Sequence, residues 1–137
     1  LRTVFSLKEQ LKPKMSITVT VFNATEILNT INYVVGTGLV QYDDIAIHVV
    51  KNPSIYSVQT LPRDIKEKIT IDIQKFLQET NLPHFYASRY EYLLNYMNDK
   101  DLYEENKSAF IDMTTKLDNI RQEDFYKVFP ELGRYYD

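Results

Sequence analysis

Residues 15–22, MSITVTVF, decide the fold class, because they form the clearest strand pattern in the chain. Aliphatic side chains stand at every second position, at Ile17, Val19 and Val21, and hydroxyl-bearing residues stand between them. Strict alternation of this kind is typical of a β-strand with one buried face. Asn23 follows, in a stretch that favours a turn. We therefore expect a strand whose aliphatic face lies against a core.

Helix and strand patterns alternate after this first strand. Apolar side chains recur every three to four residues over 27–35, which predicts a helix capped by a preceding Asn or Thr and ended by Gly36 or Gly38. Residues 45–50, IAIHVV, predict a second strand, and residues 55–59 predict a short third one. A strand–helix–strand order favours a parallel sheet with a right-handed crossover.

The second half of the chain predicts helices, because dense mixed charge surrounds its periodic apolar positions. We expect helices at about 62–79, 84–97 and 102–121, followed by a short turn or helix around Phe125. Pro62 suits the first position of a helix capped by Thr60. The expected fold class is therefore α/β, with about three parallel strands and a C-terminal helical region, or α+β if the helical tail dominates.

Composition excludes several classes of function. The chain has 137 residues, enough for one ordinary domain, and a net charge of −3, so it has no global basic surface for nucleic acid or an anionic membrane. It has no cysteine, which excludes disulfides, zinc–thiolate sites, a thiol nucleophile and a self-contained iron–sulfur cluster. No apolar run reaches about 18 residues, the length that a membrane span needs. We expect a cytoplasmic protein, and a mature or truncated chain, since it begins at Leu1 without Met.

Polar side chains gather on the less apolar faces of the predicted strands. They are Thr18, Thr20, His48, Ser57 and Gln59. In an α/β protein, polar residues on the face away from the helices suggest a cleft that holds a ligand, near the carboxyl ends of the strands. The alternative is an ordinary half-solvated sheet face, with threonine present for its β-propensity. His48 also has two interpretations. It is either a hydrogen-bond donor or base in a site, or a histidine whose ring nitrogens form hydrogen bonds within the fold.

An aromatic-rich segment lies in the predicted helix at 84–97. Tyrosine is favoured at protein interfaces because its ring is apolar and its hydroxyl polar, so Tyr92 and Tyr96 are candidates for docking a partner. The alternative is helix packing with half-buried phenols. The negative charge of the region argues against base stacking with a nucleic acid.

Three stretches of the sequence carry a resemblance to a known family. The first is residues 16–28, SITVTVFNATEIL, and the second is residues 50–62, VKNPSIYSVQTLP, followed by a Lys/Glu-rich helix. The third is TKLDNIR at 115–121, with Phe125 and the run FPEL at 129–132 after it. Their order and spacing resemble the C-terminal part of a radical S-adenosylmethionine (SAM) enzyme with a trailing twitch domain, over about residues 14–132.

The resemblance implies an incomplete (βα) barrel. In such enzymes a CxxxCxxC loop holds a [4Fe–4S] cluster, which cleaves bound SAM to a 5′-deoxyadenosyl radical that abstracts hydrogen from the substrate. Residues 14–80 would supply half of the partial barrel with about three parallel strands, and residues 81–137 a helical extension. Residues 117–132 would form a helical cover or docking element, with Asp118 and Arg121 structural rather than catalytic.

The resemblance also implies binding residues. Thr18, Thr20 and Asn23 stand where the family's polar strand-end residues approach the ribose and methionine parts of SAM. The loop from His48 to Asn52 would line the adenine or substrate side, and we add Gln59 to this substrate-binding set.

The chain departs from the family pattern in having no cysteine, so it cannot ligate the cluster. We expect it to be inactive alone, and to need an N-terminal barrel half or a cluster-bearing partner. By analogy the substrate is a peptide or protein, and we expect no nucleic acid or membrane partner. The alternative function is a non-catalytic α/β module that docks a protein through its tyrosine-rich helices or its open sheet edge.

Overall fold

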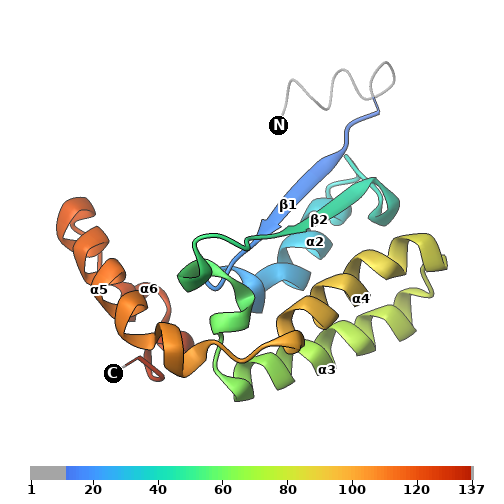
Figure 1. Ribbon diagram of the computed structural model, residues 1–137. Coiled ribbons are helices and arrows are strands. Elements are labelled where there is room, and N and C mark those ends of the chain that lie inside the picture. Colours follow the sequence, from blue (N-terminus) through green and yellow to red (C-terminus); the bar gives the residue numbers. More distant parts are fainter. Residues whose placement is uncertain (1–11, 137) are drawn as a thin grey trace.

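The computed structural model describes residues 12–136 (Figure 1). Two parallel strands, β1 (Met15–Val19) and β2 (Ile45–Val49), pair in register, with Ile17 opposite Ile47. The alternation read from the sequence is confirmed, because Ile17, Val19, Ile45 and Ile47 are buried. The parallel sheet and the mixed helix–strand class are confirmed as well.

Strand β1 ends at Val19, three residues before the predicted end. The reason lies in the turn that follows, where the Asn23 Oδ1 atom accepts a hydrogen bond from the Thr20 N–H at 2.8 Å. This bond folds the chain back before Val21, which is buried but outside the strand. A side-chain oxygen that bonds to a nearby backbone N–H offers the chain an alternative to a sheet ladder.

Helix α2 (Ile27–Gly36) connects the two strands, after one 3-10 turn, η1 (Ala24–Glu26). Ile27 and Ile31 bury the face of α2 that contacts the sheet. The predicted side-chain cap is absent from η1 and α2. Gly38 follows the helix with a φ of 72°, a left-handed conformation that glycine adopts without strain. A second 3-10 turn, η2 (Tyr42–Asp44), leads into β2.

The predicted third strand is wrong. Residues 55–59 lie in two 3-10 turns, η3 (Ser54–Tyr56) and η4 (Val58–Thr60). Each turn is closed by local backbone bonds, and the Ser57 hydroxyl accepts a further bond from the Gln59 N–H at 3.2 Å. Two carbonyls bond outside the stretch, because those of Tyr56 and Gln59 accept from the Val21 and Leu102 N–H groups at 3.0 Å. Short polar side chains that satisfy the backbone locally remove the need for a neighbouring strand. The sheet of the described residues therefore has two strands.

The predicted helices are confirmed, with ends that shift by two residues at most. They are α3 (Arg63–Thr80), α4 (His84–Asp99) and α5 (Tyr103–Arg121), and two short helices, α6 (Phe125–Val128) and α7 (Pro130–Gly133), follow. The predicted Thr60 cap of α3 is wrong, because the Thr60 hydroxyl instead donates to the Ser54 carbonyl at 2.8 Å. In the described chain no helix is both long and apolar enough to cross a membrane.

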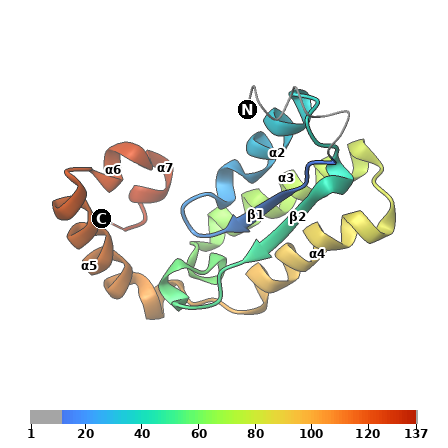
Figure 2. The ribbon, with the colours of Figure 1, turned by 90° about the horizontal axis from the view of Figure 1, so that it is seen from above.

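The helices cover one face of the sheet. Figures 1 and 2 show β1 and β2 resting on α2, α3 and α4, while α5, α6 and α7 form an arm at the end where β1 stops. One connected hydrophobic core extends from Ile17 in β1 to Tyr136 near the C-terminus. It is continuous across residue 80, where the sequence predicted the end of the barrel half, and α4 contacts both α3 and β2.

Candidate functional site

The open face of the sheet carries the first pair of predicted site residues. Thr18 and His48 lie opposite each other in the ladder, and both side chains are exposed. Ser16 and Ala46 are the preceding pair on the same face. No other residue of the range 12–136 forms a hydrogen bond with the Thr18 hydroxyl or the His48 ring. The structure therefore brings a free hydroxyl and a free imidazole together on this face.

Thr20 and Asn23 lie in the turn after β1, where local hydrogen bonds engage their side chains. Asn23 Nδ2 donates to the Thr18 carbonyl at 2.9 Å, and Asn23 Oδ1 accepts from the Thr20 N–H. The Thr20 hydroxyl accepts from the Phe22 N–H at 3.2 Å. A ligand that bound Asn23 would compete with two backbone bonds. SAM binding by these residues stays a prediction.

The Asn23 bonds lie on the outer edge of β1. The Val19 carbonyl accepts from the Val50 N–H at 3.1 Å and so points toward β2. Because alternate residues of a parallel strand bond to opposite sides, the backbone groups of Thr18 and Thr20 point away from β2. Asn23 thus occupies the place of a neighbouring strand at the end of this edge.

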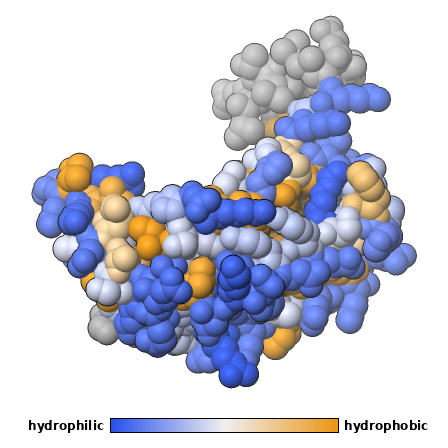
Figure 3. Space-filling model, viewed as in Figure 1, coloured by the Kyte–Doolittle hydropathy of each residue, from blue (hydrophilic) through white to orange (hydrophobic). Residues whose placement is uncertain are grey.

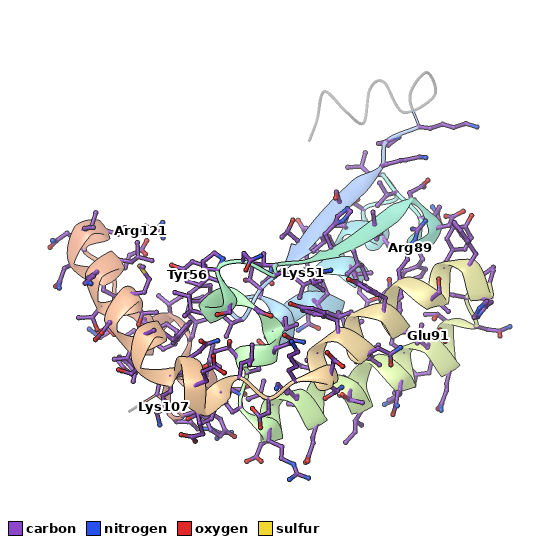
Figure 4. The ribbon with its side chains drawn as sticks, viewed as in Figure 1. Lys51, Tyr56, Arg89, Glu91, Lys107 and Arg121 are labelled. Carbon is purple, nitrogen blue, oxygen red and sulfur yellow. The ribbon has the colours of Figure 1, made fainter. Side chains whose placement is uncertain are left out.

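Arg89 of α4 likewise occupies the place of a neighbouring strand, at the start of the outer edge of β2. Its guanidinium donates to the Asp43 carbonyl at 3.1 Å and to the Ile45 carbonyl. It also lies over the rings of Phe85 and Tyr86, with its Cζ atom 5.5 and 5.1 Å from their centres. Figure 4 shows it between α4 and the start of β2. From the sequence alone Arg89 has no predicted role at the sheet edge, because no local pattern shows that α4 passes beside β2.

The predicted substrate-side residues are not gathered in one place. Asn52 is exposed after β2, whereas Gln59 is buried in η4. The Gln59 side-chain amide donates to the Tyr96 carbonyl at 2.8 Å, and its backbone carbonyl accepts from the Leu102 N–H at 3.0 Å. Gln59 therefore joins η4 to the end of α4 and the start of α5. Substrate binding by His48, Asn52 and Gln59 stays a prediction.

A pocket that sequence reasoning missed lies between the turn after β1 and the C-terminal arm. Its volume is about 560 Å³, within the range of ligand pockets. Figure 3 shows the molecule hollowed on its upper side, between the arm and the sheet. We call this the aromatic pocket; its lining residues are Phe22, Tyr56, Thr114, Leu117, Asp118, Arg121, Glu123, Phe125, Val128 and Phe129.

The floor of the aromatic pocket is built on Phe22. The Phe22 ring centre lies 5.6 Å from those of Tyr56 and Phe129, and 5.5 Å from that of Phe110. Such spacings are typical of favourable aromatic pairs. Phe22, Tyr56 and Phe129 are each partly exposed, so part of this cluster faces the pocket. The sequence shows these aromatics, but they come from three distant segments and no local pattern joins them.

Three charged side chains border the pocket. The Asp118 carboxylate accepts a hydrogen bond from the Phe125 N–H at 2.8 Å, which holds the start of α6 against α5. Arg121 and Glu123 are exposed, and neither forms an ion pair within residues 12–136. Arg121 is the last residue of α5, and it lies on the same side of the molecule as Tyr56 (Figure 4). The structural role expected for Asp118 agrees with this geometry, whereas Arg121 has a free guanidinium.

The buried titratable groups belong neither to the open sheet face nor to the lining of the aromatic pocket. Burial lowers the pKa of Lys66, whose Nζ donates to the Lys100 carbonyl at 3.0 Å and lies 3.7 Å from the Asp101 carboxylate. Burial raises the pKa of Tyr90 to about 12, and it also raises the pKa of Tyr136. These groups hold helices together and do not converge on a site.

The residues present do not fit an iron–sulfur cluster. Thr18 and His48 are exposed side by side on the open face, and SAM binding there stays a prediction. The chain has no cysteine, and within residues 12–136 no three His, Asp or Glu side chains gather to hold a metal. Comparisons with protein families, with curated proteins and with solved structures found no match to this chain.

Proposed function

We propose that this chain is the C-terminal part of a radical SAM enzyme of the twitch-containing type. It contributes part of the barrel wall and SAM and substrate contacts, and a second segment or subunit contributes the [4Fe–4S] cluster. The chain alone is inactive, because it has no cysteine to ligate that cluster. A cytoplasmic location is part of this proposal.

One observation carries the proposal: a parallel β1–α2–β2 unit has helices on one face and a bare polar face on the other. Parallel sheets occur almost only where both faces are covered. In a (βα) barrel the helices lie outside and the other face lines the interior. A partial barrel completed by further strands would turn Thr18 and His48 inward and pair the stretches of the two sheet edges that Asn23 and Arg89 leave free.

The SAM contact is assigned to Thr18 and His48, because their side chains are free and adjacent. Thr18 would donate a hydrogen bond to a ribose or carboxylate oxygen, and His48 would orient the adenine or substrate. Bound beside a reduced cluster held by the second segment or subunit, SAM would supply radical chemistry for hydrogen abstraction from the substrate. Asn23 supports this contact indirectly, because it fixes the Thr18 carbonyl and the Thr20 N–H at the end of the strand.

The test is isolation of the protein from its source under argon, in the assembly in which it occurs. We expect the assembly to contain a CxxxCxxC segment and four irons per copy. Addition of SAM should change the electron paramagnetic resonance spectrum of the reduced cluster. An assembly without iron that does not bind SAM would overturn the proposal.

Two threonine variants assign the SAM contact within that assembly. Thr18→Val removes the exposed hydroxyl and keeps the shape of the side chain, so we expect SAM affinity to fall about tenfold. Thr30→Val, on the exposed side of α2, is the matched control and should leave the affinity unchanged. Equal affinities for both variants would remove Thr18 from the site.

A second proposal, a protein-docking module, has one observation in its favour. Tyr92 on α4 is 46% exposed and stacks on Tyr96, whose ring also lies 5.7 Å from the Lys51 ammonium. Tyr96 OH lies 3.2 Å from the Ser57 hydroxyl, so only Tyr92 is free to be replaced without damage to the fold. Under this proposal Tyr92→Ala abolishes partner capture, and the isolated protein carries no iron.

A further inference from the structure

We infer that the aromatic pocket binds a peptide at a large apolar side chain that stands next to a carboxylate. This inference rests on the proposed function in one respect, the peptide nature of the substrate. The site is separate from Thr18 and His48, and it needs neither cofactor nor cluster.

The first step of the argument is the apolar floor. Phe22, Tyr56 and Phe129 each leave part of a ring exposed, and Leu117 and Val128 add aliphatic walls. Val128 is 59% exposed although it lies beside a cluster of aromatic rings. A pocket of about 560 Å³ with such walls has room for one large apolar side chain and the backbone on either side.

The second step is charge. Arg121 stands at the rim with a free guanidinium, whereas the exposed Arg63 of α3 is paired with Glu67 at 2.9 Å. Asp118, the nearest carboxylate along α5, is engaged with the Phe125 N–H. Arginine donates two parallel hydrogen bonds to a carboxylate. The Glu123 carboxylate also borders the pocket, so the inference places the ligand carboxylate beside Arg121 and not beside Glu123.

The third step is the direction in which the pocket opens. It lies on the hollowed side of the molecule, between the arm and the open sheet face (Figure 3). Tyr56 and Lys51 lie between the arm and the sheet (Figure 4), and Lys51 is exposed. A peptide held at the aromatic pocket would therefore have room to extend past Lys51 toward His48. The pocket would set which residue of the peptide reaches the sheet.

Three blocked peptides test this inference on the 137-residue chain, each titrated by two-dimensional amide NMR. They are acetyl-Gly-Phe-Asp-Gly-amide, the same peptide with Asn in place of Asp, and the same peptide with Ala in place of Phe. We expect the Phe-Asp peptide to shift the amide signals of Phe22, Leu117 and Phe125. It should bind about fivefold more tightly than the Phe-Asn peptide, and the Ala-Asp peptide should cause no shifts.

Substitutions at two exposed residues, Arg121 and Val128, assign the contacts without risk to the core. Arg121→Gln should make the Phe-Asp and Phe-Asn peptides equal in affinity, and Arg63→Gln, the matched control, should keep the fivefold difference. Val128→Asp should abolish binding of both. Shifts in another part of the protein, or equal binding of all three peptides, would overturn the inference. Because no SAM or iron is used, a negative result leaves the proposed enzyme class untouched, and a positive one does not establish it.

Discussion

Single polar side chains decide where the strands of this protein end. Asn23 bonds to both neighbours of Val19, and Arg89 bonds to the first residue of β2. Such roles escape sequence reasoning, which identifies asparagine as a turn former but not the backbone groups that it bonds. The prediction that Asn23 contacts SAM came from its position after a strand. That same position is what lets its amide reach the strand edge.

Replacement of Asn23 by alanine should destabilise the fold. Asn23→Ala removes the acceptor for the Thr20 N–H and the donor to the Thr18 carbonyl, at a cost of about 1–2 kcal/mol in the free energy of unfolding. Urea unfolding followed by circular dichroism measures this loss. Asn95→Ala, at an exposed position of α4, should change stability by less than about 0.5 kcal/mol. A similar effect of both substitutions would show that the turn does not depend on Asn23.

The hydroxyl of Tyr90 is a buried polar atom without a hydrogen-bond partner among residues 12–136. An unsatisfied buried group costs free energy, so Tyr90→Phe at pH 7 should leave stability unchanged or raise it by about 1 kcal/mol. Tyr33→Phe, at a ring that is 71% exposed, is the control and should have no effect. A loss of more than about 1 kcal/mol for Tyr90→Phe would mean that the hydroxyl has a partner.

The same tyrosine makes stability depend on alkaline pH. Burial raises its pKa to about 12, from 10.0 in an unfolded chain, so the folded state holds this proton more tightly. The resulting stabilisation is complete below pH 10 and is lost as the pH rises from about 10 to 12. Urea unfolding from pH 8 to 11.5 should show this decline, and Tyr90→Phe should reduce its slope. Because burial also raises the pKa of Tyr136, part of the slope remains.

At the scale of elements, a buried polar network attaches α5 to the turns that replace the predicted third strand. Asn106 Nδ2 donates to the Thr60 hydroxyl at 2.9 Å, and the Ser54 hydroxyl donates to Asn106 Oδ1 at 3.4 Å. The Tyr136 hydroxyl donates to the Thr60 carbonyl at 3.1 Å. Buried networks of this kind stabilise one arrangement of elements when every member is paired.

Loss of Asn106 should loosen α5 specifically. Asn106→Ala leaves the Thr60 hydroxyl without its buried donor, which should cost about 2–3 kcal/mol. Amide hydrogen exchange should become faster in α5 than in α3, because the network touches α5 alone of the two. Asn119→Ala, exposed on the same helix, should leave exchange unchanged. Equal acceleration in both helices would indicate global destabilisation instead.

The elements differ in how well the sequence predicts them. The sequence predicts the ends of the helices from Arg63 onward within two residues, since their apolar spacing is regular and residues 81–83, Asn-Leu-Pro, separate the first two. Residues 55–59 predict a strand because they contain Ile55, Tyr56 and Val58. In the structure the hydroxyls of Ser57 and Thr60 bond to nearby backbone groups instead, and residue types alone do not specify which backbone groups a hydroxyl will reach.

The same limit applies to the sites. Alternation along β1 and β2 correctly placed Thr18 and His48 on one polar face, because strand periodicity follows directly from residue spacing. Gln59 was placed with them only through the mistaken third strand. The aromatic pocket joins segments almost a hundred residues apart, Phe22 and Leu117 among them, and contacts between distant segments leave no local pattern.

At the scale of the whole molecule, one core joins the sheet to the C-terminal arm. Phe110 of α5 lies at the junction, with its ring centre 5.5 Å from that of Phe22 and 4.4 Å from that of Tyr136. Its side chain is completely buried. A core that passes through such a junction favours cooperative unfolding, even though the sequence predicted separate units at 14–80 and 81–137.

Replacement of Phe110 tests this continuity. Phe110→Ala should cost about 3–5 kcal/mol and still give one transition in thermal unfolding. The transition should coincide when followed by far-ultraviolet circular dichroism and by tyrosine fluorescence. Ile120→Ala, on the same helix but 78% exposed, should hardly move the midpoint. Two separate transitions in the unmodified protein would support independent units divided near residue 80.

The bonds of Asn23 and Arg89 have a consequence for how this protein behaves at high concentration. A strand edge with free N–H and carbonyl groups is a template on which other chains add strands and aggregate. Asn23 blocks the last part of the β1 edge, and Arg89 blocks the first part of the β2 edge. A second protein molecule therefore has only short stretches of free edge with which to pair. We expect loss of either side chain to increase light scattering in concentrated solutions well below the temperature at which the fold is lost.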